Sequence, residues 1–281
     1  MTKALNIRGE YGDESRTYAA KTWPLGTRMH LPDGQVYRYS RADSTALAAA
    51  RVMRVFRPEN NVTDLALVLP RTGPRKLTLT LFSPSNILAR DVYEDGLLFL
   101  NDGTGEGYSY HVVSNDAVIR EGTITVYLDS DWVVLPDSST RVTLLRNRYN
   151  GLAQAESPPR AAVAGVSPGV VTANSYFWLQ TSGAAVALQQ DDLEAYLPVQ
   201  ASQVTSGAVE LATTLIPTNT LSEQYSVDGI VVEPVLGDEG GPRRGRISRR
   251  SGIGVVPSIE IGYVLSPREH GQHCLVQLTL E

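Results

Sequence analysis

The sequence is poor in the features that mark membrane, secreted and nucleic-acid-binding proteins. Its 281 residues include one cysteine, Cys274, which excludes an intrachain disulfide, so stability must come from packing or oligomerisation. No apolar run approaches the roughly 20 residues that cross a bilayer, and the N-terminal residues lack the apolar segment of a signal peptide. The formal net charge of −5 argues against general nucleic-acid binding. These absences predict synthesis in a reducing cytoplasm, without nucleic-acid or membrane partners.

Motifs for phosphate binding are also missing. The stretch GTGEG (103–107) has the spacing G-x-G-x-G, whereas a dinucleotide site needs G-x-G-x-x-G at the start of a helix. No Gly-Lys-Ser or Gly-Lys-Thr ending follows, Glu106 adds a negative charge, and the next residues, YSYHVV, alternate like a strand. We therefore predict a turn between two strands, which uses the freedom of glycine at positive φ.

Metal-binding and catalytic side chains occur without the spacing that their chemistry requires. His270, His273 and Cys274 match no common zinc motif, and positions 270 and 273 face opposite sides of a strand. The pairs Asp129/Asp131 and Asp191/Asp192 are better explained as turn residues than as the facing carboxylates of a glycosidase. No G-x-S-x-G elbow is present. We predict a non-enzymatic protein with no cofactor and no metal.

Alternation of polar and apolar residues dominates what is present. In KLTLTLF (76–82) the leucines point to one side and the threonines to the other, as in a half-buried strand. The same pattern recurs in TITVYL (123–128), RVTLLR (141–146) and CLVQLTLE (274–281). Hydrophobic residues make up 42% of the chain, enough for a core, and 24 glycines and 16 prolines separate short strands. The sequence predicts a mainly β fold, an antiparallel β-barrel or sandwich.

Helical signals are confined to two short segments. Asp43 or Ser44 is a suitable cap for STALAAARVMR (44–54), whose alanines favour a helix. The segment DDLEAYL (191–197) favours one further short turn. Neither supports an alternating β-α-β pattern, which argues against Rossmann-type and TIM-type enzymes.

Composition divides the chain into three regions. Residues 1–26 are polar and mixed in charge, without periodicity, which predicts an extended N-terminal arm. Residues 27–155 are predicted to form a first β domain, which begins with a hairpin around Pro32, Asp33 and Gly34. A stretch rich in Pro, Ala, Ser and Gly (150–169) marks the boundary. Residues 156–281 form a second β-rich region, interrupted by a long loop at 237–254.

That loop concentrates positive charge in an acidic protein. It holds the five arginines Arg243, Arg244, Arg246, Arg249 and Arg250. Guanidinium groups pair bidentately with carboxylates and phosphates, so one interpretation is a docking loop for an acidic protein surface or for phosphate. The other is a solvated loop whose charges keep it exposed. The sequence leaves both open.

Four blocks of sequence carry a resemblance to a known family. They are RYSRADSTALAA (38–49), LFLNDGTGEGYSYHV (98–112), NRYNGLA (147–153) and VVTANSYFWLQTSGAAVAL (170–188). In these blocks the chain resembles the capsid decoration, or cement, proteins of tailed bacteriophages, including cyanophages. In relatives a glycine is common at the position of Ala50, and a bulky residue is common near Ser182. The resemblance implies a β-barrel or jelly-roll-like body, usually a homotrimer. It also implies binding to the major capsid protein on the outer surface of the virion, after synthesis in the bacterial cytoplasm.

The resemblance and the composition of the arm together indicate which residues meet the shell. The expected contacts are Arg8, Arg16, Lys21, Trp23, Arg38 and Arg41, with the arginine loop against a capsid subunit or a neighbouring trimer. For Trp23 a place in the core is an equal alternative. The expected function is to stabilise contacts between capsomers against the pressure of packaged DNA. The alternative function is a trimeric head fibre that binds a receptor or a carbohydrate, with SYFWLQ (175–180) stacking on sugars.

Overall fold

The regular secondary structure of the described residues consists almost entirely of β-strands. The computed structural model describes residues 5–57, 62–69, 73–81, 87–119, 122–212, 260–268 and 271–280, with strand segments at 225–227, 230–232 and 248–249. Helical backbone in this part of the chain is limited to the 3-10 turn η1 (Asp13–Ser15) and to Val62. The prediction of a mainly β fold with little helix is confirmed.

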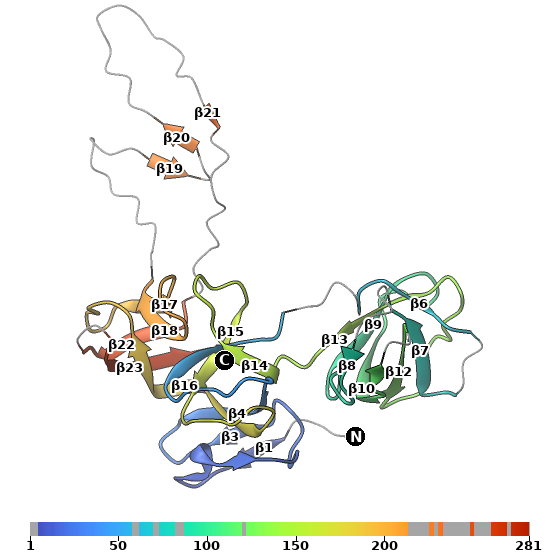
Figure 1. The fold of residues 1–281 in the computed structure, drawn as a ribbon, viewed down its shortest axis with the longest axis horizontal. Helices are drawn as coiled ribbons and strands as arrows, with labels where there is room; N and C mark the ends of the chain where they lie inside the picture. Colours follow the sequence, from blue (N-terminus) through green and yellow to red (C-terminus); the bar gives the residue numbers. More distant parts are fainter. Residues whose placement is uncertain are drawn as a thin grey trace, which may run out of the picture.

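The middle of the chain folds into a closed six-stranded barrel, drawn in teal to yellow-green in Figure 1. Around the barrel the strands are β10 (Ser109–Asn115), β12 (Thr123–Leu128), β7 (Lys76–Thr80), β6 (Leu65–Leu67), β13 (Arg141–Leu145) and β9 (Leu97–Asp102). Alternation turns Leu77 and Leu79 inward, while the hydroxyl oxygens of Thr78 and Thr125 meet outside at 3.2 Å. A separate pair is formed by β8 (Ile87–Leu88) and β11 (Val118–Ile119). The predicted β-barrel is therefore present.

The other strands form a body in which one long strand, β16 (Tyr176–Gln189), belongs to two closed rings. Its first half pairs with β4 (Val36–Ala42) and β15 (Val163–Ser167), and β5 (Arg51–Arg54) and β14 (Asn150–Gln154) complete that ring. Its second half pairs with β23 (His273–Thr279) and β18 (Ala208–Leu211), and β17 (Pro198–Ala201) and β22 (Gly262–Ser266) complete the other. Because β16 lies in both rings, the two rings cannot move independently.

Each barrel or ring has its own hydrophobic core. The six-stranded barrel encloses Leu98, Val126 and their neighbours. The first ring encloses an aromatic core that includes Tyr39 and Trp178. A third cluster, with Val276 from the second ring, extends to strands of the first. Three linked cores explain how one chain is stabilised without disulfides.

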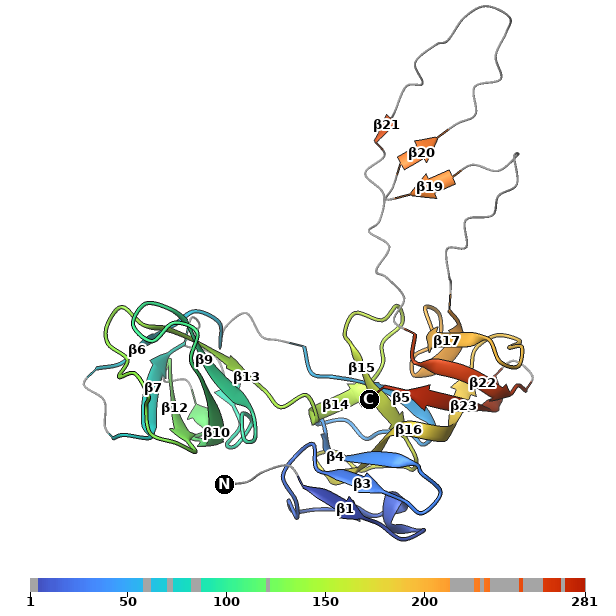
Figure 2. The same ribbon diagram turned by 180° about the vertical axis from the view of Figure 1, so that it is seen from behind.

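The N-terminal segment requires a correction to the predicted arm. Its backbone is extended, but it lies on the body: β1 (Asn6–Arg8) pairs with β3 (Arg28–His30), and β2 (Thr17–Tyr18) pairs with β16. Figure 2 shows β1 and β3 beside β4 at one end of the body. The predicted hairpin is confirmed, since β3 pairs with β4 across a turn in which Gly34 has φ 87°. Pairing of its backbone groups holds the segment in place.

The structure divides the chain differently from the predicted boundary at 156. The six-stranded barrel is inserted between β5 and β14 of the body, and β15 and β16 pair with β5 and β4 from the N-terminal side of the insertion. In both views the barrel lies to one side of the body (Figures 1 and 2). The Pro- and Ala-rich stretch after 150 includes β14 and β15, so it is part of a ring rather than a linker.

The predicted helix over 44–54 is wrong. Residues 51–54 form strand β5, which pairs on both sides, and Val52 and Met53 are both fully buried. A strand between two neighbours satisfies every backbone group and buries both faces, which outweighs the small helix propensity of the alanines. Ala50 enters the strand with φ 55°, a left-handed conformation that glycine favours. The helical turn predicted within 191–197 does not form: residues 195–196 make a non-helical turn in which Tyr196 has φ 67°.

Most of the arginine-rich loop lies outside the described residues. The backbone of Ser248–Arg249 forms β21, which pairs with β20 (Ile230–Val232), and β20 pairs with β19 (Tyr225–Val227). Arg243, Arg244, Arg246 and Arg250 fall outside the described part, and for Arg249 only the backbone is described. The docking interpretation of this loop therefore stays a prediction.

Candidate interaction surfaces

Lys21 joins the N-terminal segment to the inserted barrel. Its Nζ lies 2.6 Å from Oδ2 of Asp95 and 2.8 Å from Oε1 of Glu94, two residues that precede β9. The Asp95 side chain is 3% exposed and that of Lys21 is 17% exposed. Burial lowers the pKa of Lys21, but hydrogen bonds and charge from the two carboxylates outweigh burial, so its pKa is raised. Lys21 is thus engaged within the chain.

Hydrogen bonds extend this junction on both sides of the ion pair. The Leu25 N–H donates to Asp95 Oδ2 at 2.8 Å. Asn147 Nδ2 donates to the Asp95 carbonyl at 3.0 Å, and the buried Asn150 donates through Nδ2 to the carbonyl of Val92 at 2.9 Å. These contacts link body residues 21–25 and 147–150 to barrel residues 92–95. We call the group formed by Lys21, Asp95 and these hydrogen bonds the junction latch.

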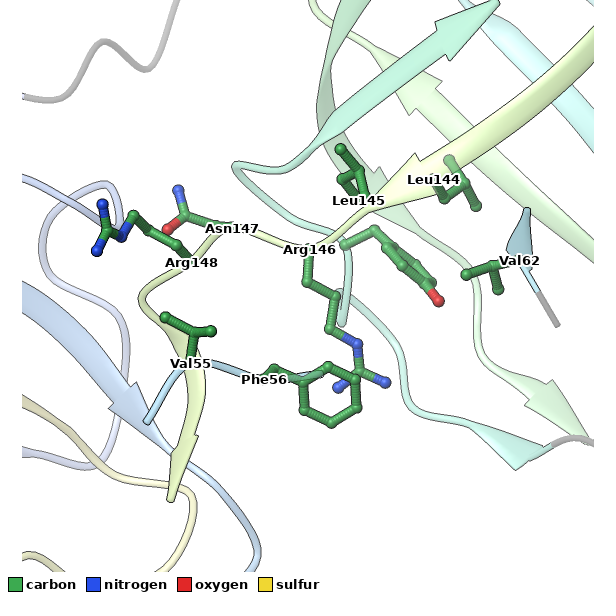
Figure 3. A pocket seen from close by; sticks show the side chains of 9 residues that line it. Val55, Phe56, Val62, Leu144, Leu145, Arg146, Asn147 and Arg148 are labelled. Atoms are coloured by element: carbon green, nitrogen blue, oxygen red, sulfur yellow. The ribbon is translucent and has the colours of Figure 1, made fainter. Parts of the chain in front are cut away.

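A small cavity of about 110 Å³ lies beside the latch, where the two chain crossings between body and barrel pass each other. Figure 3 shows Arg146 extended over the ring of Phe56, with Leu144 and Leu145 on the barrel side. The Arg146 Cζ lies 3.5 Å from the Phe56 ring centroid and 5.6 Å from that of Tyr93. The Arg146 guanidinium therefore packs between two aromatic side chains, Phe56 next to the body and Tyr93 next to the barrel.

Trp23 occupies the alternative predicted for it, a place against the core. Its ring lies 5.4 Å from that of Tyr18, 5.2 Å from that of Tyr39 and 5.2 Å from that of Trp178. Edge-to-face and tilted contacts at these distances stabilise aromatic clusters. Trp23 is thus a packing residue, and its indole is not presented as a free anchor.

Arginines gather around the ring of Tyr149 on the body. Arg28 on β3 and Arg38 on β4 are direct cross-strand neighbours, although like charges opposite each other are unfavourable. The guanidinium carbons of Arg38 and Arg148 lie 5.9 and 5.2 Å from the centroid of the Tyr149 ring. Burial lowers the pKa of Arg38, and the charges of Arg28 and Arg148 lower it further, against an opposing effect of Tyr149. We call Arg28, Arg38 and Arg148 the arginine cluster.

The other predicted contact residues lie apart from this cluster. Arg8 is exposed at the end of β1, and Arg16 is exposed and pairs with Asp13 at 3.0 Å. Arg41 lies over the Tyr176 ring at 5.6 Å and donates through Nε to the Asn174 carbonyl at 3.4 Å. Of the predicted set, only Arg38 belongs to the arginine cluster. Arg28 and Arg148 were missed, because only the cross-strand register and the Tyr149 ring bring them together.

The glycine-rich stretch is a turn between β9 and β10, as predicted. Gly103, Gly105 and Gly107 all have positive φ, between 74° and 87°. The turn is attached to the loop after β12, since Thr104 Oγ1 donates to Asp137 Oδ2 at 2.7 Å. Hydrogen bonds from Ser139 and Thr104 lower the pKa of Asp137. The hairpin is therefore held by its neighbouring loop.

The cysteine, the histidines and the acidic pairs that the sequence offered as candidate metal-binding or catalytic groups do not come together in a site among the described residues. Cys274 is buried on β23, where burial raises the pKa of its thiol to about 11. His273 is exposed, and His270 lies outside the described residues. Asp131 pairs with Arg75 at 2.7 Å, and Asp129 and Asp131 follow β12 while Asp191 and Asp192 follow β16. Among the described residues no three His, Cys, Asp or Glu side chains are grouped to hold a metal.

No helix in the described residues has the length and apolar character needed to cross a membrane. Comparison of the chain with protein-family models, curated proteins and solved structures gives no match.

Proposed function

We propose that this chain is a non-enzymatic cement protein that binds the outer surface of a tailed-phage head and holds neighbouring capsomers together. Its partners are then the major capsid protein and further copies of itself, as a homotrimer. The four blocks that resemble decoration proteins support the proposal. They coincide with β4, the β9–β10 hairpin, the link into β14, and β16. The positive φ of Ala50 fits the glycine that is common there in relatives.

The junction latch is the observation that carries the proposal. A protein that resists separation of two capsomers must transmit force between its contacts, so a free hinge between its parts would defeat the purpose. Here the inserted barrel is joined to the body by a buried ion pair and by hydrogen bonds from Leu25, Asn147 and Asn150. The strand β16 in turn connects the two rings of the body. The described part of the chain up to residue 212, with β22 and β23, is therefore suited to bear load as one piece.

The arginine cluster is the contact that we assign to the shell. Guanidinium groups pair bidentately with carboxylates. Arg148 is exposed beside the Tyr149 ring, and Arg38 donates from Nη1 to the Gly26 carbonyl at 3.2 Å. A single such contact is weak at physiological salt. Three copies held in one trimer become strong only where the shell presents three sites at a matching spacing, so assembled shells are bound in preference to free subunits.

The alternative, a head fibre that binds carbohydrate, gains no support from the aromatic segment 175–180. Phe177 and Trp178 are buried, and Tyr176 lies under Arg41 and against Tyr39. Sugar stacking needs an exposed aromatic face. A glycan array discriminates the two functions, since reproducible sugar binding would favour the fibre.

Addition of the purified chain to undecorated expanded heads tests the proposal. The wild-type chain should bind in a fixed stoichiometry and raise the temperature at which the heads release DNA. Arg148→Glu should lower occupancy, whereas Arg160→Glu, a matched reversal at an exposed arginine outside the cluster, should not. Deletion of the N-terminal segment is unsuitable, because it removes Lys21 and Tyr18 from their contacts. Heads that neither bind the wild-type chain nor gain heat resistance would refute the function.

A further inference from the structure

One end of the six-stranded barrel presents an exposed apolar surface. In the loop between β12 and β13, Val133 is 71% exposed and Leu135 is 61% exposed, and Tyr108 on the β9–β10 hairpin is 42% exposed. The two loops are in contact, since the Thr104 N–H donates to Ser139 Oγ at 3.2 Å and Thr140 Oγ1 donates to the Thr104 carbonyl at 2.8 Å. We call Tyr108, Val133 and Leu135 the barrel tip. Exposed apolar side chains on adjoining loops are candidates for an interaction site.

The barrel tip is held in a fixed conformation. Trp132 packs edge-to-face on Tyr110, with ring centroids 4.5 Å apart, and the Val133 N–H donates to the Tyr110 hydroxyl at 3.2 Å. Downstream of the tip, Asp137 is tied to the hairpin by the hydrogen bond from Thr104. A loop that is already ordered loses little conformational entropy when it binds. The ordered loop therefore holds the exposed side chains in position for a partner before binding.

The surroundings of the barrel tip are acidic. Segments 102–108 and 129–140 contain no lysine, arginine or histidine, and they contain the five carboxylates Asp102, Glu106, Asp129, Asp131 and Asp137. Arg75 pairs with Asp131, and Arg141 donates to the carbonyls of Ser138 and Thr140, so two of these five charges are offset and the balance stays negative. Hydrogen bonding lowers the pKa of Asp137, so this carboxylate is ionised at neutral pH. Charge complementarity then requires a partner surface that is basic around an apolar centre.

We propose that the barrel tip inserts Val133 and Leu135 into an apolar pocket that is bordered by lysine or arginine on a shell subunit. The identity of the partner rests on the proposed function, whereas the chemistry of the pocket follows from the tip. The contact differs in kind from the arginine cluster, which seeks carboxylates. The arginine cluster and the barrel tip carry opposite charge, so neither can bind the site on the shell that fits the other. The chain therefore binds the shell in a single orientation.

Point variants on exposed residues test the proposal without endangering the fold. Val133→Asp should weaken binding to undecorated expanded heads at least tenfold, because it buries a charge at the centre of the contact. Val170→Asp is the matched control, since Val170 is 72% exposed on the body, and it should bind as wild type does. Glu106→Lys should also weaken binding, because it places a positive charge against a basic border.

The outcomes separate this proposal from the proposed function. If the wild-type chain does not bind heads, the proposed function fails and the shell is lost as the partner. If the wild type binds and Val133→Asp binds equally well, or Val170→Asp is weakened to the same degree, the tip is not the contact. Stronger binding by Glu106→Lys would overturn the basic pocket. Loss of oligomeric mass by Val133→Asp in light scattering, with head binding unchanged, would assign the tip to a second copy and overturn the proposal.

Discussion

Replacement of Lys21 by methionine tests whether the junction latch holds the inserted barrel to the body. The change leaves the Asp95 carboxylate 3% exposed, with the Leu25 N–H as its recorded hydrogen-bond donor. Removal of one partner from a buried ion pair costs about 3 to 5 kcal/mol. We therefore expect Lys21→Met to lower the free energy of unfolding by about 3 kcal/mol.

The raised pKa of Lys21 determines how the loss depends on pH. The stabilisation from the charged Lys21 is fully present below the ordinary lysine pKa, and it is lost as the pH rises through the folded pKa. The difference in unfolding free energy between wild type and Lys21→Met should therefore shrink above about pH 10.4.

A double-mutant cycle supplies the control for this prediction. Asp95→Asn keeps an acceptor for the Leu25 N–H, and the double variant removes both charges. The loss of unfolding free energy in the double variant should therefore be smaller than the sum of the two single losses by at least about 1.5 kcal/mol. Arg16→Met removes an exposed ion pair and should cost less than about 0.5 kcal/mol. Chemical denaturation followed by circular dichroism measures all five proteins. Losses that add to within about 0.5 kcal/mol would show that Lys21 and Asp95 are not coupled.

Three further predictions concern backbone strain and the single thiol. Ala50→Gly relieves φ 55° and should leave the free energy of unfolding unchanged or raise it by up to about 1 kcal/mol; a clear loss in chemical denaturation would contradict this. Burial raises the pKa of Cys274 to about 11, so the native thiol should resist a thiol reagent at pH 8 and react once denaturant is added; immediate labelling would show an open thiol. A Cβ at Gly262 would overlap the carbonyl oxygen of Gln277, so Gly262→Ala should cost roughly 2 kcal/mol or more, whereas Gly169→Ala, in open space, should be neutral; equal soluble yield and stability would refute the difference.

Local periodicity was sufficient to predict individual strands. The alternating segments at 76–82, 123–128 and 141–146 correspond to β7, β12 and β13, and the C-terminal one to β23. The glycine-rich turn was equally predictable, because its spacing and its flanking strands are adjacent in sequence. In each case one short window determines which side chains face inward.

Pairings between distant segments could not be predicted in the same way. The strand β16 pairs with β4 across more than 130 residues, and no local pattern reports such a partner. Composition therefore placed a boundary where β14 and β15 close a ring. Lys21 was assigned to an external contact for the same reason, since Asp95 lies 74 positions away. In the helix predicted over 44–54, local propensity amounts to tenths of a kcal/mol per residue, less than the burial of Val52 and Met53 provides.

The barrel tip had a sequence signal that alternation does not use. The run WVVLP (132–136) is apolar without a period of two, and it lies between the turn-forming stretches DSD and PDSS. A run that is apolar at successive positions cannot turn all of them inward, so it exposes some of them unless another segment covers it. Whether a cover exists is a property of the tertiary fold, so the exposure of Val133 and Leu135 had to be seen in the structure.

One strand connects the two proposed contact sites, the barrel tip and the arginine cluster, and this gives the junction latch a mechanical role. Strand β13 begins directly after the tip loop and ends three residues before Arg148. Its five residues span about 17 Å at the usual rise of a strand. If the barrel pivoted at residues 146–149, strand β13 would rotate with it, and tension on the barrel tip would not reach the arginine cluster. Lys21→Met should therefore leave the occupancy of heads close to that of wild type while it lowers their heat resistance, whereas Val133→Asp should lower both. Full heat resistance in heads saturated with Lys21→Met would show that stiffness at this junction does not contribute to the function.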